Sequence, residues 1–345
     1  MSLKKLNIAV VGATGYVGLD LILLLTKHPK IKIKYLCAQK NIGKELSFFD
    51  KRIRQRLPKI TSSSKVNWSE IDIVFLSLPN GEAQKLVTKF VKFINFKYID
   101  LSADFRLFNP NDYKIWYNTS HKAKHLIKDS IYSISEFTKE KIKNYKIVAN
   151  PGCYPTSIQL PLIPLIKNKV IKNNNIIIDS KSGFSGAGKN LKRKFKHKNL
   201  YSSIQAYGIK KHRHMSELDQ EFKKTGYNVD YLFSPHLLPT FRGILSTIYV
   251  DLNKGFSAKK VLSLLKNKHK KSNFVKFAKL NTSIGTGNII NTNICEISVC
   301  ETRFKNKVVI YSALDNLIKG ASGQATQNMN LMYGYNETLG LKGRF

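Results

Sequence analysis

Short apolar segments alternate with helical patterns along the first 150 residues, and this alternation limits the folds open to the chain. The stretches between the apolar segments, such as residues 82–93, carry apolar side chains at helical spacing. Strands that alternate with helices build a parallel sheet, because each helix returns the chain to the start of the next strand. The candidate strands are residues 7–11, 31–38, 71–78, 98–103 and 146–149. The sequence therefore predicts βαβ units around a parallel sheet.

The pattern changes after residue 150. Candidate strands at 294–300 and 307–314 are separated by a short polar stretch, which predicts an antiparallel hairpin. Two prolines, Pro161 and Pro164, lie in the helical pattern after Cys153, so that helix is expected to be short or bent. Further strands are expected at 176–179 and 241–252, and helices at 216–224 and 322–333.

The turn after the first candidate strand is rich in glycine and reads Gly12-Ala13-Thr14-Gly15-Tyr16-Val17-Gly18. Glycines at such a turn let the backbone approach a pyrophosphate, and the start of the next helix presents unpaired N–H groups to it. An ordinary tight turn is the alternative, but the position directly after a clear strand favours a dinucleotide site. The candidate cofactor residues here are Gly12, Thr14, Gly15, Tyr16, Val17 and Gly18.

The end of the second candidate strand bears on the choice between NAD and NADP. An acidic residue there would hold the ribose 2′-hydroxyl of NAD. This chain has Gln39 and Lys40 instead, and the first acidic residue is Glu45. Lys40 and Lys44 suit a 2′-phosphate, so NADP(H) is the preferred cofactor.

Cys153 is the candidate nucleophile. It lies in Asn150-Pro151-Gly152-Cys153-Tyr154-Pro155-Thr156, where a strand ends and Pro155 suits the first turn of a helix. A helix N-terminus favours a thiolate over a thiol. The other cysteines, Cys37, Cys295 and Cys300, lie in apolar strand patterns and are interpreted as small buried side chains.

A histidine is the usual proton carrier beside a nucleophilic cysteine. His212 and His214 stand at the head of a candidate helix, and Glu217 is spaced to orient the imidazole of His214. The sequence leaves open which histidine acts as the acid. His197 and His269 lie in lysine-rich stretches and are expected to be solvated. No further ligands of suitable spacing accompany the pair, so no metal site is expected.

Further candidates are residues that can bind anions. Ser185 and Gly186 belong to a glycine-rich loop, residues 182–188, which could form a nest of N–H groups. Only nine of the 58 basic residues are arginines, and a guanidinium fits carboxylate or phosphate in a way that lysine does not. The arginines beside other motifs are Arg106, Arg213 and Arg242.

The formal charge of +36 does not by itself indicate a polyanion partner. The 49 lysines are spread from end to end, and we expect them to attract small anions. One basic run, residues 189–198, could bind nucleic acid, but a solvated loop is favoured because no nucleic-acid-binding motif accompanies it. No apolar run is long enough to span a membrane, and no signal peptide or disulfide framework is recognisable. A cytoplasmic location is expected.

Taken together, these segments resemble the N-acetyl-gamma-glutamyl-phosphate reductase family of arginine biosynthesis, within the wider aspartate-semialdehyde dehydrogenase group. The Cys153 and His212–Glu217 blocks are the specific ones, and the resemblance covers almost the whole chain. The segments that carry it are GATGYVG at 12–18, DLSADFRL at 100–107, NPGCYPT at 150–156, SGFSGAGK at 182–189, HRHMSE at 212–217, PHLLPTFRGIL at 235–245 and DNLIKGASGQATQNMNLMYG at 315–334.

The resemblance implies a fold of class α/β. A Rossmann-like NADP-binding domain would comprise residues 1–150 and 316–345, so that the C-terminal helix returns to it. An α+β catalytic and dimerisation domain would comprise residues 151–315. A homodimer or homotetramer is implied, with no nucleic acid or membrane partner.

The implied reaction is NADPH-dependent reductive dephosphorylation of N-acetyl-L-glutamyl 5-phosphate to the 5-semialdehyde through a thioester. Cys153 matches the family nucleophile, and His212 or His214 would handle the proton. Arg106 and Arg242 would hold the carboxylate and phosphate of the substrate, and Asn316 resembles a cofactor contact of the family. The alternatives are a related reductase acting on aspartyl phosphate or a carrier-bound amino-acid phosphate, or a basic nucleic-acid-binding protein.

Overall fold

The computed structural model describes residues 5–91, 96–189, 199 and 202–345, and these form two compact units. The first unit comprises residues 1–151, 321–343 and 345, and the second comprises residues 152–320 and 344. Most of the basic run at 189–198 lies outside the described residues. No helix in the described ranges has both the length and the apolar character that crossing a bilayer requires.

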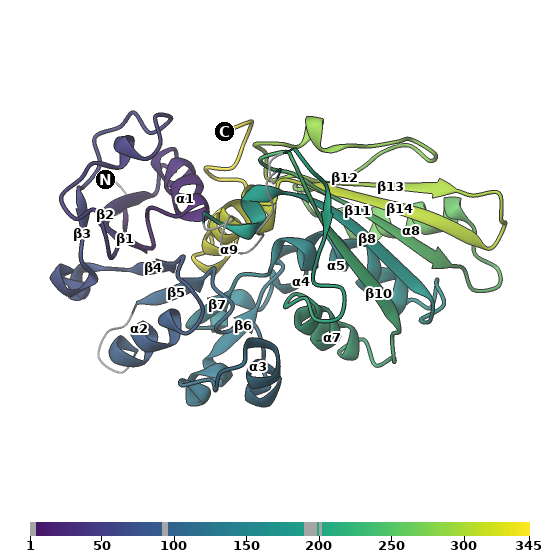
Figure 1. Ribbon diagram of the computed structural model, residues 1–345, viewed down its shortest axis with the longest axis horizontal. Coiled ribbons are helices and arrows are strands. Elements are labelled where there is room, and N and C mark those ends of the chain that lie inside the picture. Colours follow the sequence, from purple (N-terminus) through teal and green to yellow (C-terminus); the bar gives the residue numbers. More distant parts are fainter. Residues whose placement is uncertain (1–4, 92–95, 190–198, 200–201) are drawn as a thin grey trace. The chain divides into compact units, whose positions relative to one another are not determined.

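The first unit is built on a sheet of seven parallel strands in the order β3-β2-β1-β4-β5-β7-β6 (Figure 1). All its neighbouring strands run parallel, as the alternation of strand and helix predicts. The strands are β1 (Leu6–Val11), β2 (Ile31–Cys37), β3 (Ile60–Thr61), β4 (Ile73–Leu76), β5 (Lys97–Asp100), β6 (Ser130–Tyr132) and β7 (Ile147–Ala149). The helices are α1 (Tyr16–Thr26), α2 (Glu82–Phe90), α3 (Pro110–Tyr117), α4 (Ser135–Thr138) and α9 (Gly323–Met332).

Strand β1 shows why this sheet is buried on both faces. Ile8 and Val10 pack into a core with α1 and with Met329 of α9, whereas Ala9 and Val11 face a second core that includes Val87 of α2. Successive side chains of a strand point to opposite faces, so an unbroken apolar run needs a cover on each side. The helix near the C-terminus, α9, lies against α1 and supplies part of one cover. The expected return of the C-terminal helix to the Rossmann-like unit is confirmed.

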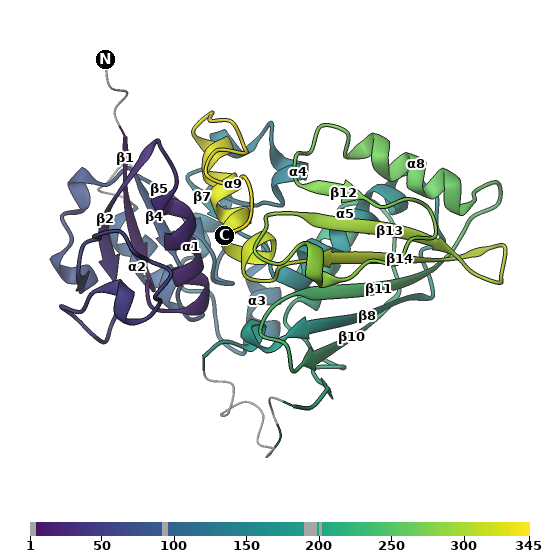
Figure 2. The ribbon, with the colours of Figure 1, turned by 90° about the horizontal axis from the view of Figure 1, so that it is seen from above.

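The second unit contains a mixed sheet in the order β12-β13-β14-β11-β8-β10-β9. The predicted antiparallel hairpin is present as β13 and β14. Helix α5 packs on β11 and β14 and α8 on β13, so both helices cover one face (Figure 2). The strands are β8 (Ile176–Gly183), β9 (Gln205–Ala206), β10 (Tyr231–Leu238), β11 (Ile244–Asp251), β12 (Val275–Phe277), β13 (Cys295–Glu301) and β14 (Lys307–Leu314). The helices are α5 (Cys153–Lys167), α7 (Met215–Lys223) and α8 (Ala258–Lys268).

Helix α5 is longer than its prolines suggested. It runs for 15 residues with Pro161 and Pro164 inside it, so of the two alternatives, a short or a bent helix, the short helix is wrong. Pro164 has no N–H for the carbonyl of Leu160, and His269 Nε2 lies 2.9 Å from that oxygen instead. His269 is buried, which corrects the expectation that it is solvated. A side chain from outside the helix thus satisfies a carbonyl that proline leaves open.

Candidate functional site

Cys153 is the first residue of α5, and Gly152 precedes it as the N-cap. Strand β7 ends at Ala149, so only Asn150 to Gly152 separate the sheet of the first unit from the helix. The thiol is free and partly buried. The unpaired N–H groups of a helix N-terminus stabilise a negative charge placed there, which suits a thiolate.

Two glycines leave space for the groups around Cys153. A Cβ on Gly152 would lie 2.5 Å from His214 Nε2 and 2.9 Å from Glu217 Oε1. A Cβ on Gly320 would lie 2.6 Å from Cys153 Cβ. Gly320 belongs to a single π-helical turn, Ile318–Ser322, a form that often occurs at functional sites. Both glycines are therefore required by close packing rather than by an unusual backbone angle.

Glu217 connects the histidine pair to the start of α5. Its carboxylate is fully buried, and Oε2 accepts a hydrogen bond of 2.8 Å from the backbone N–H of Gly152. Its other oxygen, Oε1, lies 4.0 Å from His214 Nε2. Glu217 therefore faces the N-cap of the cysteine helix with one oxygen and the imidazole of His214 with the other.

His212 has a different environment. Its ring lies against the rings of Tyr154, Tyr207 and Phe233, with centroid distances of 5.6, 5.4 and 5.5 Å. Burial lowers the pKa of His212 to about 4, and the positive charge of Arg213 acts in the same direction. The imidazole is therefore neutral at neutral pH.

Tyr154 and Tyr207 form a hydrogen-bonded pair beside this histidine. Tyr207 Oη donates to Tyr154 Oη over 3.2 Å, and Tyr154 Oη donates to the carbonyl of His236. Burial is the main reason that both phenols have a raised pKa, and the charge of Cys153 adds to it. The two tyrosines consequently lie within electrostatic reach of the candidate nucleophile.

The three candidate arginines have different surroundings. Arg106, in the first unit, is mostly buried, and it donates through Nε to the carbonyl of Asn150 and through Nη2 to that of Leu101. Arg213 is exposed between the two histidines in the chain. Arg242 is buried, and its Nη1 lies 3.2 Å from Asp315 Oδ2 and 2.9 Å from Asn291 Oδ1. Of the three, Arg213 is the most accessible.

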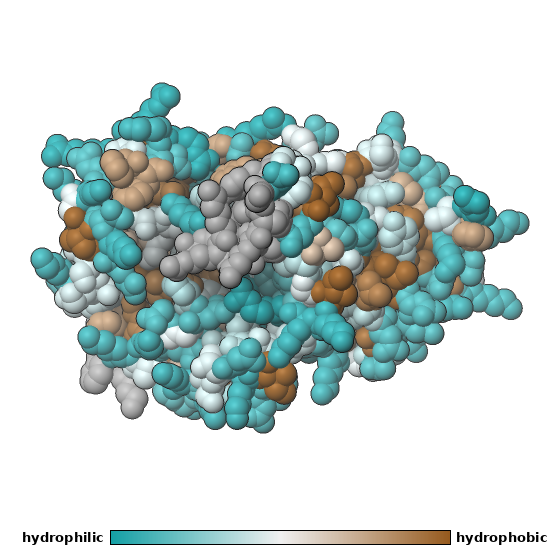
Figure 3. Space-filling model, viewed as in Figure 1, coloured by the Kyte–Doolittle hydropathy of each residue, from teal (hydrophilic) through white to brown (hydrophobic). Residues whose placement is uncertain are grey.

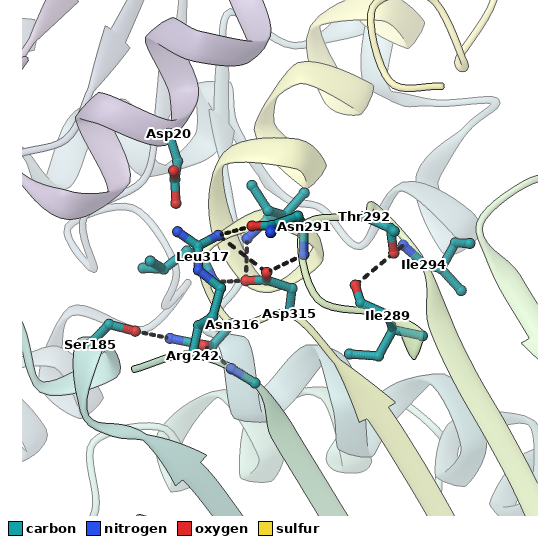
Figure 4. A network of polar contacts seen from close by, with 12 residues as sticks. Asp20, Ser185, Arg242, Ile289, Asn291, Thr292, Ile294, Asp315, Asn316 and Leu317 are labelled. Carbon is teal, nitrogen blue, oxygen red and sulfur yellow. Dashed lines mark hydrogen bonds and ion pairs between the residues drawn. The ribbon is translucent and has the colours of Figure 1, made fainter. Parts of the chain in front are cut away.

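The ion pair of Arg242 and Asp315 belongs to a wider network (Figure 4). Asp315 Oδ1 accepts from the N–H of Leu317, and Oδ2 accepts from that of Asn291. The neighbouring residue, Asn316, accepts from the N–H of Gly243 through Oδ1 and donates to Ser185 Oγ through Nδ2. The network fixes the glycine-rich loop to the residue that follows β14.

In the first unit, the glycine turn has the local geometry of a phosphate-binding turn. Gly12 has a φ of +92°, and a Cβ there would lie 2.0 Å from the carbonyl oxygen of Ser77. A Cβ on Gly18 would lie 2.3 Å from the carbonyl oxygen of Gly12. Gly15 is the N-cap of α1, and the nearest atom to a Cβ on it would be the carbonyl oxygen of Gly12 at 3.6 Å. No side chain caps this helix by a hydrogen bond. The turn packs tightly against the sheet and leaves its outer side open, which fits a bound pyrophosphate.

The remaining turn residues and the end of β2 complete the candidate cofactor positions. Thr14 lies in the turn, and Tyr16 and Val17 begin α1; all three are partly exposed. Gln39 and Lys40 are exposed directly after β2, where the 2′-phosphate of NADP(H) would bind. In the second unit, Gly186 lies in the 3₁₀ turn Phe184–Ala187, with Ser182 Oγ 3.1 Å from the place of a Cβ.

The other cysteines differ in burial. Cys37 and Cys295 are buried, as expected, and burial raises the pKa of the Cys37 thiol to about 12. Cys300 is only partly buried, so the expectation is wrong for that residue, which stands near the end of β13. No cluster of three or more potential metal ligands occurs among the described residues.

Sequence reasoning missed several residues around the candidate site. Tyr207 and Phe233 carry no motif of their own, and their positions follow only from the strand order that places their segments together. Gly320 had a usable signal, because glycine inside a helical pattern often marks a close approach.

Two family models match the chain over successive segments. Residues 7–145 match the model described as semialdehyde dehydrogenase, NAD binding domain, and residues 153–316 match semialdehyde dehydrogenase, dimerisation domain. A solved aspartate semialdehyde dehydrogenase II from Vibrio cholerae has the same fold, with a TM-score of 0.72 at 17% identity over 96% of this chain and 99% of that one. The chain is thus a protein of the semialdehyde dehydrogenase class.

Curated relatives narrow the class to a family. The chain is 41% identical to a probable chloroplastic N-acetyl-gamma-glutamyl-phosphate reductase of Oryza sativa subsp. japonica, over 98% of this chain and 82% of that one. It is 42% identical to the N-acetyl-gamma-glutamyl-phosphate reductase of Ehrlichia canis, over 98% and 97% of the two chains. The chain belongs to the N-acetyl-gamma-glutamyl-phosphate reductase family.

Proposed function

We propose that this protein reduces N-acetyl-gamma-glutamyl phosphate to the corresponding semialdehyde, with Cys153 as the nucleophile and NADPH as the hydride donor. The observation that carries the proposal is the placement of Cys153 at the N-terminus of α5, next to Gly152, whose N–H is bound by Glu217. Membership of the reductase family supplies the substrate. The step belongs to arginine biosynthesis.

The first step is an acyl transfer to sulfur. The thiolate of Cys153 attacks the acyl carbon, a C–S bond forms, and the carbonyl electron pair moves onto oxygen. When the carbonyl re-forms, the C–O bond to phosphate breaks, and phosphate leaves with the bonding pair and takes up a proton. A histidine of the pair His212 and His214 delivers that proton, since it lies beside the nucleophile in the fold.

We assign cofactor contacts in each unit separately. The glycine turn, with Gly12, Thr14, Gly15, Tyr16, Val17 and Gly18, receives the pyrophosphate, and Gln39 and Lys40 receive the 2′-phosphate. In the second unit, Asn316 fixes the loop of Ser185 and Gly186, which we assign to cofactor contacts as well. When bound, NADPH supplies the hydride that reduces the thioester, after which the aldehyde separates from the Cys153 thiolate.

Arginines recognise the anionic ends of the substrate. We assign Arg213 to this role because it is exposed next to both histidines. Arg106 and Arg242 remain candidates for the substrate carboxylate and phosphate, although each already donates hydrogen bonds inside its own unit. The planar fork of a guanidinium matches carboxylate and phosphate oxygens, which is why these two arginines stay on the list.

We also propose that two copies pair through the uncovered face of the second sheet. Ile177, Leu232 and Tyr249 are side by side on β8, β10 and β11, with exposed fractions of 45, 53 and 43%. Figure 3 shows hydrophobic residues gathered on this face. The match to a dimerisation domain supports a second copy as the occupant. Light scattering should give a dimer or tetramer, and Ile177→Lys should lower the mass to that of a smaller species.

A cytoplasmic location is consistent with the chemistry, because the nucleophile must remain a free thiol, and all four cysteines are free.

The decisive experiment is an assay of NADPH oxidation with N-acetyl-gamma-glutamyl phosphate and, separately, with aspartyl phosphate. Turnover that strongly prefers the first substrate supports the proposal. Preference for aspartyl phosphate would replace the substrate and leave the mechanism in place. Cys153→Ser should abolish thioester formation while NADPH still binds.

A further inference from the structure

His212 and His214 lie close together but are held in different ways. Their ring centroids are 4.9 Å apart. His214 Nε2 faces the carboxylate of Glu217, whereas His212 Nδ1 accepts a hydrogen bond of 3.2 Å from the backbone N–H of His214. A ring nitrogen that accepts a hydrogen bond carries no proton, so neutral His212 has its proton on Nε2.

The Nε2–H of His212 is available to a ligand. No residue in the described part of the chain forms a hydrogen bond with this atom, and the side chain is only partly buried. The ring cannot turn freely, because Tyr154, Tyr207 and Phe233 enclose it. The result is a fixed donor with one free N–H.

This donor belongs to the same cluster as Cys153. The charge of Cys153 acts on both Tyr154 and Tyr207, and the rings of both tyrosines contact His212. His214 packs over Gly152, the residue before the nucleophile. An acyl group bonded to Cys153 would therefore enter a cluster that contains both imidazoles.

We propose that the two histidines divide the chemistry: His212 Nε2–H donates to the oxyanion that forms when Cys153 adds to the acyl phosphate, and His214, oriented by Glu217, transfers the proton. This inference rests on the proposed function. In the addition step, the C–S bond forms and the carbonyl electron pair moves to the oxygen that His212 binds. When the C–O bond to phosphate breaks, the proton of His214 goes to phosphate, and His212 keeps its own proton throughout.

A neutral imidazole suits the role of oxyanion donor and does not suit the role of proton carrier. A fixed donor stabilises developing charge without reorganising, and loss of one such donor typically costs about 100- to 1000-fold in rate. A proton carrier must titrate near the working pH. His212 is desolvated and stands next to Arg213, so its charged form is disfavoured. His214 has a different neighbour, since its Nε2 lies 4.0 Å from Glu217 Oε1, which orients the ring.

The test uses the first half-reaction, which needs no NADPH. Mixing the protein with N-acetyl-gamma-glutamyl phosphate should release one phosphate per site in a burst, whose rate is followed against pH in His212→Gln, His212→Ala and His214→Gln. The carboxamide of Gln can supply an N–H near the position of His212 Nε2 and does not titrate. The titratable groups that face His214 are Glu217, His212 and Tyr154. The His214 variant keeps all three, so a change in its pH dependence comes from the loss of the His214 imidazole.

We expect His212→Ala to slow the burst about 100-fold and His212→Gln by about tenfold or less, with the pH dependence of the wild type retained in both. His214→Gln should lose that pH dependence. The division of roles is overturned if His212→Gln is as slow as His212→Ala and has lost the pH dependence, or if His212→Ala is as fast as the wild type. Equal rates of Cys153 alkylation in the variants show that the cluster is intact. A wild type that bursts only with aspartyl phosphate would refute the proposed substrate, and the same variants would then be compared with that substrate.

Discussion

The backbone N–H of Gly152 donates a hydrogen bond to Glu217 Oε2 over 2.8 Å, and this bond joins the start of the cysteine helix to the histidine segment. Because the carboxylate is fully buried, the bond is shielded from competing water. The placement of Cys153 therefore depends on a side chain 64 residues further along the chain.

Two replacements of Glu217 should distinguish the effect of its bond to the Gly152 N–H from the effect of its charge on His214. Glu217→Gln keeps an oxygen for the Gly152 N–H but loses the charge that faces His214, so we expect a slower reaction with little loss of stability. Glu217→Ala leaves a buried N–H without an acceptor, which should cost about 1 to 3 kcal/mol in unfolding free energy. Urea denaturation and turnover measure the two effects. Glu221→Gln is the control and should change neither, because this carboxylate lies in the same helix but pairs with Lys224.

Gly320→Ala should displace the nucleophile. The new Cβ would lie 2.6 Å from Cys153 Cβ, so the π-helical turn or α5 has to move. We expect a loss of thioester formation of at least tenfold and a lower melting temperature. Gly287→Ala is the matched control, because nothing lies within 4 Å of its Cβ. Equal activity of the two alanine variants would contradict the packing argument.

Alkylation should distinguish the cysteines. Iodoacetamide reacts with thiolates, and burial raises the pKa of Cys37 to about 12, so that thiol stays protonated at neutral pH. Cys295 is also buried, and its Sγ lies 3.3 Å from Ser312 Oγ. Mass spectrometry of the folded protein should therefore find Cys153 modified first. Faster labelling in Cys153→Ser than in the wild type would be incompatible with this assignment.

The lowered pKa of His212 has a consequence for stability in acid. The folded pKa is about 4 and the unfolded value about 6.5, so below pH 6.5 the unfolded chain binds the proton more readily. Unfolding free energy should fall as the pH drops from 6.5 to 4, and this contribution should be constant above 6.5. Other buried histidines act in the same direction, so the quantity to measure is the difference between wild type and His212→Gln across this range. The variant should show the shallower fall, and identical slopes would exclude a neutral buried His212.

The ion pair of Arg242 and Asp315 should be worth far more than an exposed pair. Asp315→Asn removes a buried negative charge that lies 3.2 Å from the Arg242 guanidinium, which should cost about 3 to 5 kcal/mol in unfolding free energy. Asp251→Asn breaks the more exposed pair with Lys307 and should cost about 1 kcal/mol or less. Denaturant melts of the two variants give the comparison. A loss at Asp315 no larger than at Asp251 would mean that the network does not fix the loop of Ser185.

The sequence was most informative where one local pattern determines one element. Five strands of the first unit, β1, β2, β4, β5 and β7, and the hairpin of β13 and β14 follow from their apolar runs, because burial requires such runs. The short strands β3 and β6 were not predicted. The cysteine and histidine blocks were recognisable because glycine, proline and histidine are unusual at those positions.

The rest depended on contacts between distant segments. The length of α5 could not be read from its prolines, because the carbonyl of Leu160 is satisfied by His269 from another helix end. The enclosure of His212 by Tyr207 and Phe233 likewise depends on the pairing of β9 with β10, because Tyr207 follows β9 and Phe233 lies in β10. Burial of His269 in a lysine-rich stretch has the same cause, since neighbouring lysines do not reveal where one side chain points.

The two prolines within α5 also affect when the nucleophile becomes reactive. A helix with two internal prolines has little tendency to form alone, since each proline removes a backbone hydrogen bond. We expect α5 to form only when the surrounding sheet has assembled around it. A nascent or partly unfolded chain would then carry Cys153 as an ordinary thiol, and its special reactivity would report that folding is complete.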